Sequence, residues 1–206
     1  MGLTAGQLRE GLDALAAREP KIADALAIAG YPEPRRRPTG YITLLRTIVG
    51  QQVSVAAAAS VWRKLEAELG EDMAASELIA RNFDTLRACG LSRQKQGYAR
   101  SLCELVDSGM LDLENLPEDD EDAIAELTRI KGIGRWSAEI YLLFAEGRPD
   151  IWPAGDLAVQ KAVGKIMRLD EALPKERDVR ALAEAWRPHR GAMAVFSWHT
   201  YNMEAI

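Results

Sequence analysis

The sequence predicts an all-α fold. Ala, Leu, Glu and Arg dominate the chain, and these residues favour helices. Few runs show the alternation of apolar and polar residues that a half-buried strand requires, whereas apolar residues recur at helical spacing. Because glycines and prolines separate these segments, about ten helices joined by short turns are expected.

The first 40 residues are expected to form two helices and a connector. Thr4, with Gln7 three residues further on, is typical of a capping box and predicts a helix that runs to about residue 17. A second, short helix is predicted over residues 22–28. The glycine and two prolines that follow it predict an extended connector, because the residue before a proline is disfavoured in a helix.

The remaining helices are predicted from apolar spacing and from the residues at their ends. Residues 41–69 predict one or two helices, and Gly50 marks a break or a tight contact inside this stretch. A polar connector is expected over residues 112–120. The other predicted helices span residues 76–89, 92–108, 121–128, 135–146, 156–168, 178–186 and 190–201.

No repeat, low-complexity segment or long linker divides the chain. We therefore expect residues 1–206 to form a single two-lobed unit, with a helical bundle over 41–120 and a second lobe of 121–206 with part of 1–40. The chain has 206 residues, 48% of them hydrophobic, and is long enough to bury a sizeable core.

Composition argues against several classes of protein. No stretch approaches 18 apolar residues and the N-terminus does not resemble a signal peptide, so a cytosolic location is expected. Cys89 and Cys103 are too few for a disulfide framework, and His189 and His199 are not spaced as a metal pair. The net charge of −5 argues against a strongly electrostatic nucleic-acid binder without excluding one, since basic residues gather at 35–37, 93–100 and 129–135.

The most informative segment is residues 127–138, LTRIKGIGRWSA, in which Gly132 and Gly134 flank Ile133 between two predicted helices. Glycines permit a tight turn and close approach to the main chain, so the amides of this turn and of the following helix start could bind a DNA phosphate. Ile133 is expected to pack inward. The backbone carbonyls of Thr128, Ile130 and Ile133 are candidates to hold a monovalent cation, Na⁺ or K⁺. An ordinary glycine-capped turn is the alternative.

Asp156 follows a Pro-Ala-Gly turn and precedes an apolar helix, 22 residues after Gly134. Aspartate is a favoured N-cap, so capping alone would account for it. A catalytic role for Asp156 needs the context of other motifs.

That context is a set of motifs in a fixed order. IKGIGRW at residues 130–136 followed by PAGD at 153–156 resembles the helix–hairpin–helix, the Gly/Pro-rich loop and the aspartate of the DNA glycosylase superfamily. Further segments resemble its 3-methyladenine DNA glycosylase II branch, namely IVGQQVSVAA at 48–57, LRACGLSRQK at 86–95, and WRPHRG at 186–191 through Trp198. The resemblance extends over roughly residues 40–202.

The resemblance implies a two-lobed helical DNA glycosylase fold with a helix–hairpin–helix motif, lacking the N-terminal β domain of some members. It implies a monofunctional enzyme that flips alkylated bases, of the 3-methyladenine and 7-methylguanine type, out of double-stranded DNA and hydrolyses their N-glycosidic bonds in base excision repair. No catalytic metal or organic cofactor is implied, and we expect a monomer.

The resemblance also assigns roles to particular residues. Asp156 would face the sugar of the flipped nucleotide, where a carboxylate stabilises the positive charge that develops as the bond breaks. Members that also cut the backbone carry a lysine two residues after the second hairpin glycine, whereas this chain has Trp136 there. Trp136, Trp198 and Tyr41 are candidates for the base pocket, and tryptophans that merely fill the core are the alternative.

Gln51 and Gln52 match the region that fills the gap left by the flipped base, where some relatives place an apolar wedge at the position of Gln52. The other candidates for DNA binding are Gly132, Ile133, Gly134, Arg135, Ser137, Arg93 and Lys95. For the charged residues among them, a solvated helix face is the alternative. The chain departs from relatives at Lys131, where proline is common, and at Gly155, where some carry an acidic residue.

Two other functions remain open. The first is a glycosylase of the same superfamily that acts on mismatched or oxidised bases. The second is a non-catalytic helix–hairpin–helix module, which would need the hairpin but neither Asp156 nor the paired tryptophans.

Overall fold

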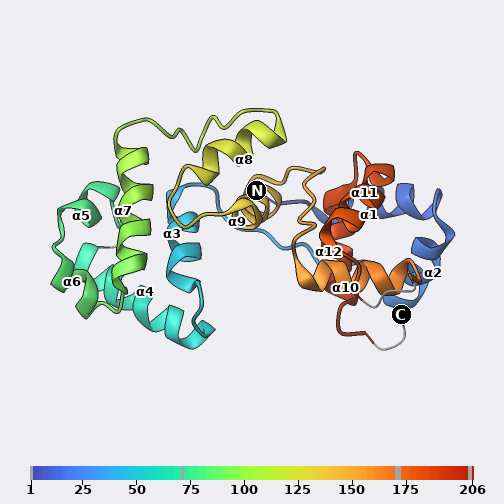
Figure 1. Ribbon diagram of the computed structural model, residues 1–206, viewed down its shortest axis with the longest axis horizontal. Helices are drawn as coiled ribbons and strands as arrows, with labels where there is room; N and C mark the ends of the chain where they lie inside the picture. Colours follow the sequence, from blue (N-terminus) through green and yellow to red (C-terminus); the bar gives the residue numbers. More distant parts are fainter. Residues whose placement is uncertain (1, 71, 170–172, 204–205) are drawn as a thin grey trace. The chain divides into compact units, whose positions relative to one another are not determined.

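The computed structural model describes residues 2–70, 72–169, 173–203 and 206. These residues form helices and connectors, and no strand occurs among them (Figure 1). None of the helices described is both long and apolar enough to cross a membrane. The all-α fold class predicted from the sequence is therefore confirmed for the described part of the chain.

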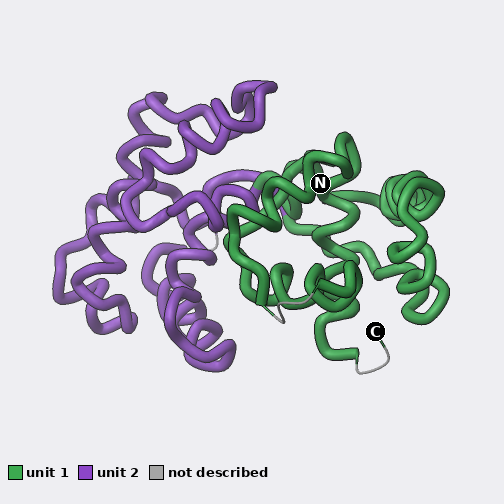
Figure 2. The backbone as a smooth tube through the Cα atoms, turned by 45° about the vertical axis from the view of Figure 1, so that its right-hand side comes forward, with its two compact units in different colours: residues 1–37, 142–206 green, residues 38–141 purple. Residues whose placement is uncertain are grey.

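The chain divides into two compact units, one of residues 1–37 with 142–206 and one of residues 38–141 (Figure 2). The lobe boundary that we expected near residue 120 therefore lies elsewhere. Residues 121–141, which include the glycine hairpin, belong to the same unit as the helical bundle.

The unit of residues 1–37 and 142–206 is centred on its last helix. Its elements are α1 (Ala5–Ala16), α2 (Pro20–Ala29), the π-helical segment η1 (Leu142–Glu146), α10 (Leu157–Ile166), α11 (Glu176–Leu182), the 3-10 segment η2 (Ala183–Trp186) and α12 (Arg190–Thr200). Helix α12 packs against α1 and α10, and α2 also contacts α1 and α10. Leu8, Leu12, Ile22, Val163 and Phe196 are buried in its core.

The unit of residues 38–141 is organised around α7. Its helices are α3 (Tyr41–Gly50), α4 (Val55–Leu69), α5 (Ala75–Ala80), α6 (Phe83–Ala88), α7 (Arg93–Asp107), α8 (Asp120–Thr128) and α9 (Arg135–Tyr141). Helix α7 stands beside α3 and α5 and also contacts α6, while α9 packs against α3 and α8 (Figure 1). Leu44, Leu45, Leu65, Leu86 and Leu102 are buried in its core.

The capping and glycine signals predicted several helix ends correctly. The Thr4 hydroxyl accepts the Gln7 amide at 3.2 Å and the Gln7 side chain accepts the Thr4 amide at 2.9 Å, which confirms the capping box. The break at Gly50 is also confirmed, because α3 ends there.

The single helix predicted over residues 76–89 is wrong. The chain is extended at Arg81 and Asn82, and the Asn82 side chain accepts the Thr85 amide at 2.9 Å to cap a second helix, α6. A capping asparagine therefore prevailed over apolar periodicity at this point. The helix predicted over residues 135–146 does form, but its last five residues adopt the π-helical segment η1.

Candidate functional site

Asp156 is fixed by three hydrogen bonds to one carboxylate oxygen. Its Oδ1 accepts the amides of Ala158 at 2.9 Å and Val159 at 3.0 Å, so Asp156 is the N-cap of α10. The same oxygen accepts the indole N–H of Trp198 at 3.2 Å. A cap needs only the two amides, so the contact from Trp198 is the first sign that this carboxylate has a further role.

The loop that leads to Asp156 is anchored by the start of α12. The Gly191 amide donates to the carbonyl of Pro149 at 2.8 Å, and a Cβ at Gly191 would lie 2.7 Å from that oxygen. The guanidinium of Arg190 binds both carboxylate oxygens of Asp150, each at 2.9 Å, and its side chain is only 9% exposed. Since Trp198 lies on the same helix, α12 contacts this loop both near its start and at Asp156.

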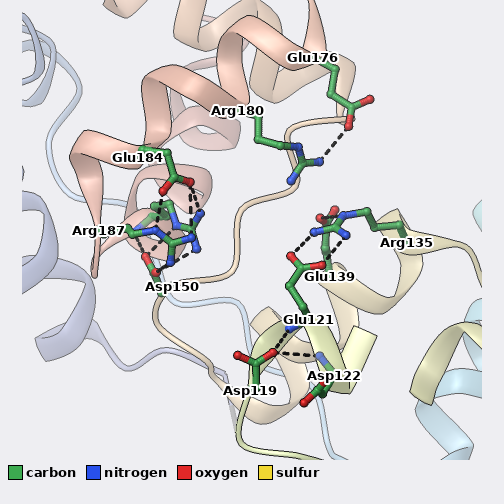
Figure 3. Close-up of polar contacts among 11 residues, drawn as sticks. Asp119, Glu121, Asp122, Arg135, Glu139, Asp150, Glu176, Arg180, Glu184 and Arg187 are labelled. Carbon is green, nitrogen blue, oxygen red and sulfur yellow. Dashed lines mark hydrogen bonds and ion pairs between the residues drawn. The ribbon is translucent and has the colours of Figure 1, made fainter. Parts of the chain in front are cut away.

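Arg187 and Glu184 complete the ion-pair network around Asp150, as Figure 3 shows. Arg187 donates to Asp150 at 2.6 Å and to Glu184 at 2.8 Å, and Arg190 also donates to Glu184 at 3.1 Å. The hydrogen bond from Arg187 is the main cause of a lowered pKa of the Glu184 carboxyl. The network therefore joins η2 and α12 to the loop before Asp156.

Trp198 and Asp156, which the sequence predicted as pocket and catalytic residues, lie in direct contact. The half-buried indole of Trp198 also packs on Phe144 of η1, with ring centroids 5.4 Å apart and planes inclined by 40°. Sequence reasoning missed Phe144, because it lies in a run of apolar residues that all look like ordinary core residues.

The glycine hairpin has the tight geometry predicted for it. Gly132 has a φ of +83°, and a Cβ there would lie 2.2 Å from the ring of Tyr98, so only glycine fits. Ile133 packs inward and is 3% exposed, as predicted. The Lys131 amide donates to the hydroxyl of Ser101 at 3.1 Å, so Tyr98 and Ser101 attach the hairpin to α7. Apart from Gly134 itself and its two chain neighbours, no atom lies within 4 Å of a Cβ placed on Gly134. The turn is therefore open on the side to which a Gly134 side chain would point.

The turn after α3 is held between the hairpin and α7. The side-chain amide of Gln51 donates to the carbonyl of Gly132 at 2.8 Å. The ammonium of Lys95 donates to the carbonyl of Val49 at 2.7 Å, and burial lowers its pKa. Lys95, predicted to contact phosphate, therefore has an intramolecular partner and stabilises the end of α3. Gln52, in the same turn, is exposed and has a φ of +55°, a conformation that non-glycine residues rarely adopt.

The basic candidates near the hairpin differ in what they contact. Arg135 donates to the Glu121 carboxylate at 2.7 and 2.5 Å and to buried Glu139 at 2.9 Å (Figure 3), and the hydrogen bonds to Glu121 are the largest cause of its raised pKa. Arg135 therefore joins α8 to α9, which the prediction of a phosphate contact did not anticipate. Arg93 is exposed and lies over the Phe83 ring at 4.6 Å, and Ser137 is half-buried in the first turn of α9.

The other two aromatic candidates belong to the unit of residues 38–141. Trp136 is 47% exposed, as a ligand-binding aromatic residue should be and a core residue should not. The hydroxyl of Tyr41 is buried without a hydrogen-bonding partner among the described residues. Burial, with a smaller contribution from Cys103, raises the pKa of Tyr41 to about 12, so the phenol stays protonated. The pocket roles of Trp136 and Tyr41 remain predictions.

Comparison with known proteins identifies the family whose motifs these are. The model of the HhH-GPD superfamily of base excision DNA repair proteins matches residues 45–188. A protein of the fission yeast Schizosaccharomyces pombe, DNA-3-methyladenine glycosylase 1, is 32% identical over 167 residues, which cover 79% of this chain and 73% of the yeast protein.

Two solved structures are similar over almost the whole chain. The S. pombe 3-methyladenine DNA glycosylase Mag1, solved in complex with abasic DNA, has a TM-score of 0.80 and 27% identity, and the match covers 96% of this chain and 98% of Mag1. A DNA-3-methyladenine glycosidase from Bacillus halodurans has a TM-score of 0.86 and 28% identity, with 95% and 90% of the two chains covered.

Proposed function

Because the chain belongs to the HhH-GPD superfamily of base excision DNA repair proteins, we propose that it is a glycosylase that hydrolyses the N-glycosidic bond of alkylated bases in double-stranded DNA. The observation that carries this proposal is the carboxylate of Asp156, fixed at the start of α10 and bound by the indole of Trp198. Relatives named as 3-methyladenine glycosylases support the choice of alkylated bases.

The chemistry assigned to Asp156 is electrostatic. As the bond between C1′ and the base nitrogen breaks, the electron pair leaves with the base and positive charge develops on the deoxyribose. A carboxylate held rigidly beside the sugar stabilises that charge and can orient the water that adds to C1′. Three donors to Oδ1 hold this carboxylate in position before the substrate arrives.

A tryptophan in contact with the carboxylate also suits a charged base. Alkylated purines of this type carry positive charge, and a cation over an indole face gains roughly 0.5–2 kcal/mol. Trp198, whose indole N–H donates to Asp156, is the indole that we assign to the base. A base-binding role for the half-exposed Trp136 stays a prediction from the sequence.

The hairpin is assigned to the DNA backbone. The left-handed conformation of Gly132 and the open surroundings of Gly134 allow a phosphate to approach the main chain. Such a contact positions the enzyme without reading sequence.

A monovalent cation beside the hairpin fits part of the predicted ligand set. In the described part of the chain, no backbone amide outside α8 donates to the carbonyl of Thr128, and none donates to that of Ile133, which lies between α8 and α9. The carbonyl of Ile130, in contrast, accepts the Ile133 amide at 3.0 Å. Na⁺ or K⁺ held by these carbonyls would add positive charge next to the phosphate. We assign the cation no part in breaking the glycosidic bond.

The test of this function is release of bases from methylated duplex DNA by the purified protein. We expect free 3-methyladenine or 7-methylguanine and an intact abasic site, and no protein–DNA adduct after borohydride, because Trp136 has no amine. Binding without release of any base would favour a non-catalytic DNA-binding module. Release only from mismatched or oxidised DNA would favour another lesion class, and a trapped adduct would refute monofunctional chemistry.

Sedimentation of the free protein tests the expected monomer.

Replacing Trp198 by phenylalanine tests the contact to Asp156. The variant keeps an aromatic ring against Phe144 but loses the hydrogen bond to the carboxylate. A hydrogen bond to a charged group contributes about 1.5–3 kcal/mol, so we expect the single-turnover rate of base release to fall roughly 10- to 100-fold. The measurement is base release at saturating enzyme.

Trp62 provides the matched control, because its indole N–H also donates to a carboxylate, that of Glu66, at 2.5 Å in α4. Trp62→Phe should leave base release within about threefold of wild type. Equal effects of the two substitutions would show that loss of an indole hydrogen bond acts only through stability.

A further inference from the structure

Three consecutive arginines, Arg35, Arg36 and Arg37, lie exposed in the connector between α2 and α3. In the described part of the chain, the side chains of Arg35 and Arg36 have no hydrogen-bonding or ion-pair partner. The protein carries a net charge of −5, so a run of three exposed cations without acidic partners is locally exceptional. We call residues 35–37 the arginine run.

The backbone of the arginine run is held in place. The Arg37 amide donates to the carbonyl of Phe144 at 2.8 Å. Gly2 fits between the carbonyls of Arg35 and Phe144, since a Cβ there would lie 2.7 and 2.6 Å from the two oxygens. The run is therefore fixed against η1 on one side and the N-terminal segment on the other.

Successive contacts lead from the arginine run to Asp156 within one unit. The Arg37 guanidinium lies over the Phe144 ring, 6.0 Å from its centroid. The same ring packs on Trp198 at 5.4 Å, and Trp198 donates to Asp156 at 3.2 Å. These residues all belong to the unit of residues 1–37 and 142–206, so the contacts from the arginine run to Asp156 lie within one compact unit.

We propose that the arginine run binds backbone phosphates of the DNA strand whose flipped nucleotide faces Asp156. The inference rests on the proposed function, which brings the sugar of one nucleotide to Asp156 and its flanking phosphates to the surface nearby. Guanidinium groups bind phosphate oxygens through two parallel hydrogen bonds, and arginine favours such planar recognition over lysine. The run gives this unit a contact with the DNA backbone separate from the glycine hairpin in the other unit.

The test is the salt dependence of binding to a duplex that contains a tetrahydrofuran abasic-site analogue. Arg35, Arg36 and Arg37 are replaced together by glutamine. Each phosphate contact contributes about 0.9 to the slope of log Kd against log salt concentration, so we expect the slope to fall by about two or more and Kd at low salt to rise at least tenfold. Lysines at the same positions should restore most of the slope, because they keep the charge.

The matched control replaces three other exposed arginines of the same unit, Arg18, Arg168 and Arg177, by glutamine. It removes the same charge from the turn after α1, the turn after α10 and helix α11, and should leave the slope within about one-half of the wild-type value. Equal slopes for wild type and the arginine-run variant, or an equal loss in the control, would overturn the proposal. Wild-type protein that shows no salt-dependent binding to the abasic duplex would refute the proposed function as well.

Discussion

Asp156→Asn is expected to slow base release by at least about a hundredfold while leaving DNA binding intact. Asparagine caps a helix about as well as aspartate, so the amides of Ala158 and Val159 keep an acceptor and the fold should not change. What is lost is the negative charge that stabilises the cationic sugar. Loss of one preorganised electrostatic interaction typically costs about 10²–10³ in rate, so we expect single-turnover release of 7-methylguanine to fall by at least about a hundredfold.

Asp119 offers a control of the same geometry. It caps α8 by accepting the amides of Glu121 at 2.9 Å and Asp122 at 3.0 Å (Figure 3), the same distances as at Asp156. Asp119→Asn should retain base release within about twofold, because asparagine preserves the cap. If Asp156→Asn also retained near-wild-type release, the carboxylate would be a cap and nothing more. Unchanged affinity of both variants for an abasic duplex would show that the loss lies in chemistry.

The features that the sequence predicted well are those decided by neighbouring residues. The capping box of Thr4, the break at Gly50 and the inward packing of Ile133 each depend on a few adjacent residues. Asp156 also belongs here, since its position before an apolar helix made the N-cap foreseeable. Local hydrogen-bonding and steric preferences act over one or two turns, and a single sequence displays them directly.

The features that the sequence did not predict depend on partners distant along the chain. The charges of Lys95 and Arg135 predict phosphate contacts, yet each side chain has an intramolecular partner, the carbonyl of Val49 and the carboxylate of Glu121 respectively. The packing of Phe144 under Trp198 and the bond from Gln51 to Gly132 likewise join distant segments. Residue type shows that a cation or an amide can form a hydrogen bond or ion pair, but the tertiary fold determines its partner.

The WRPHRG segment, residues 186–191, has a pattern that the sequence displays and partners that it does not. Residues 186–191 resemble the 3-methyladenine DNA glycosylase II branch, but the sequence gives no indication of the partners of their two arginines. In the structure, Arg187 and Arg190 converge on Asp150, which lies about 40 residues earlier in the chain, just before the loop of Asp156. The segment therefore acts on the proposed active site through the loop that it anchors.

Removing the buried cation of this network is expected to destabilise the protein strongly. Arg190→Met preserves much of the side-chain volume but leaves Asp150, whose side chain is only 16% exposed, without its two-point partner. Breaking a buried ion pair by removing one member costs about 3–5 kcal/mol, and we expect about 3 here because Arg187 still contacts Asp150. For a chain of this size that corresponds to a fall of roughly 6–12 °C in Tm, measurable by calorimetry.

Arg187→Met tests whether the loss of stability depends on the burial of the ion pair or on ion pairing alone. Arg187 contacts the same two carboxylates, Asp150 and Glu184, but its side chain is 50% exposed, against 9% for Arg190. Exposed pairs contribute about 0–1 kcal/mol, so this substitution should lower Tm by no more than a few degrees. A loss equal to that of Arg190→Met would contradict our account, because the two arginines differ mainly in desolvation and in the two-point contact. If Arg190→Lys, which keeps the charge, recovers only part of the stability, then the paired geometry that holds the loop before Asp156 contributes beyond the charge itself.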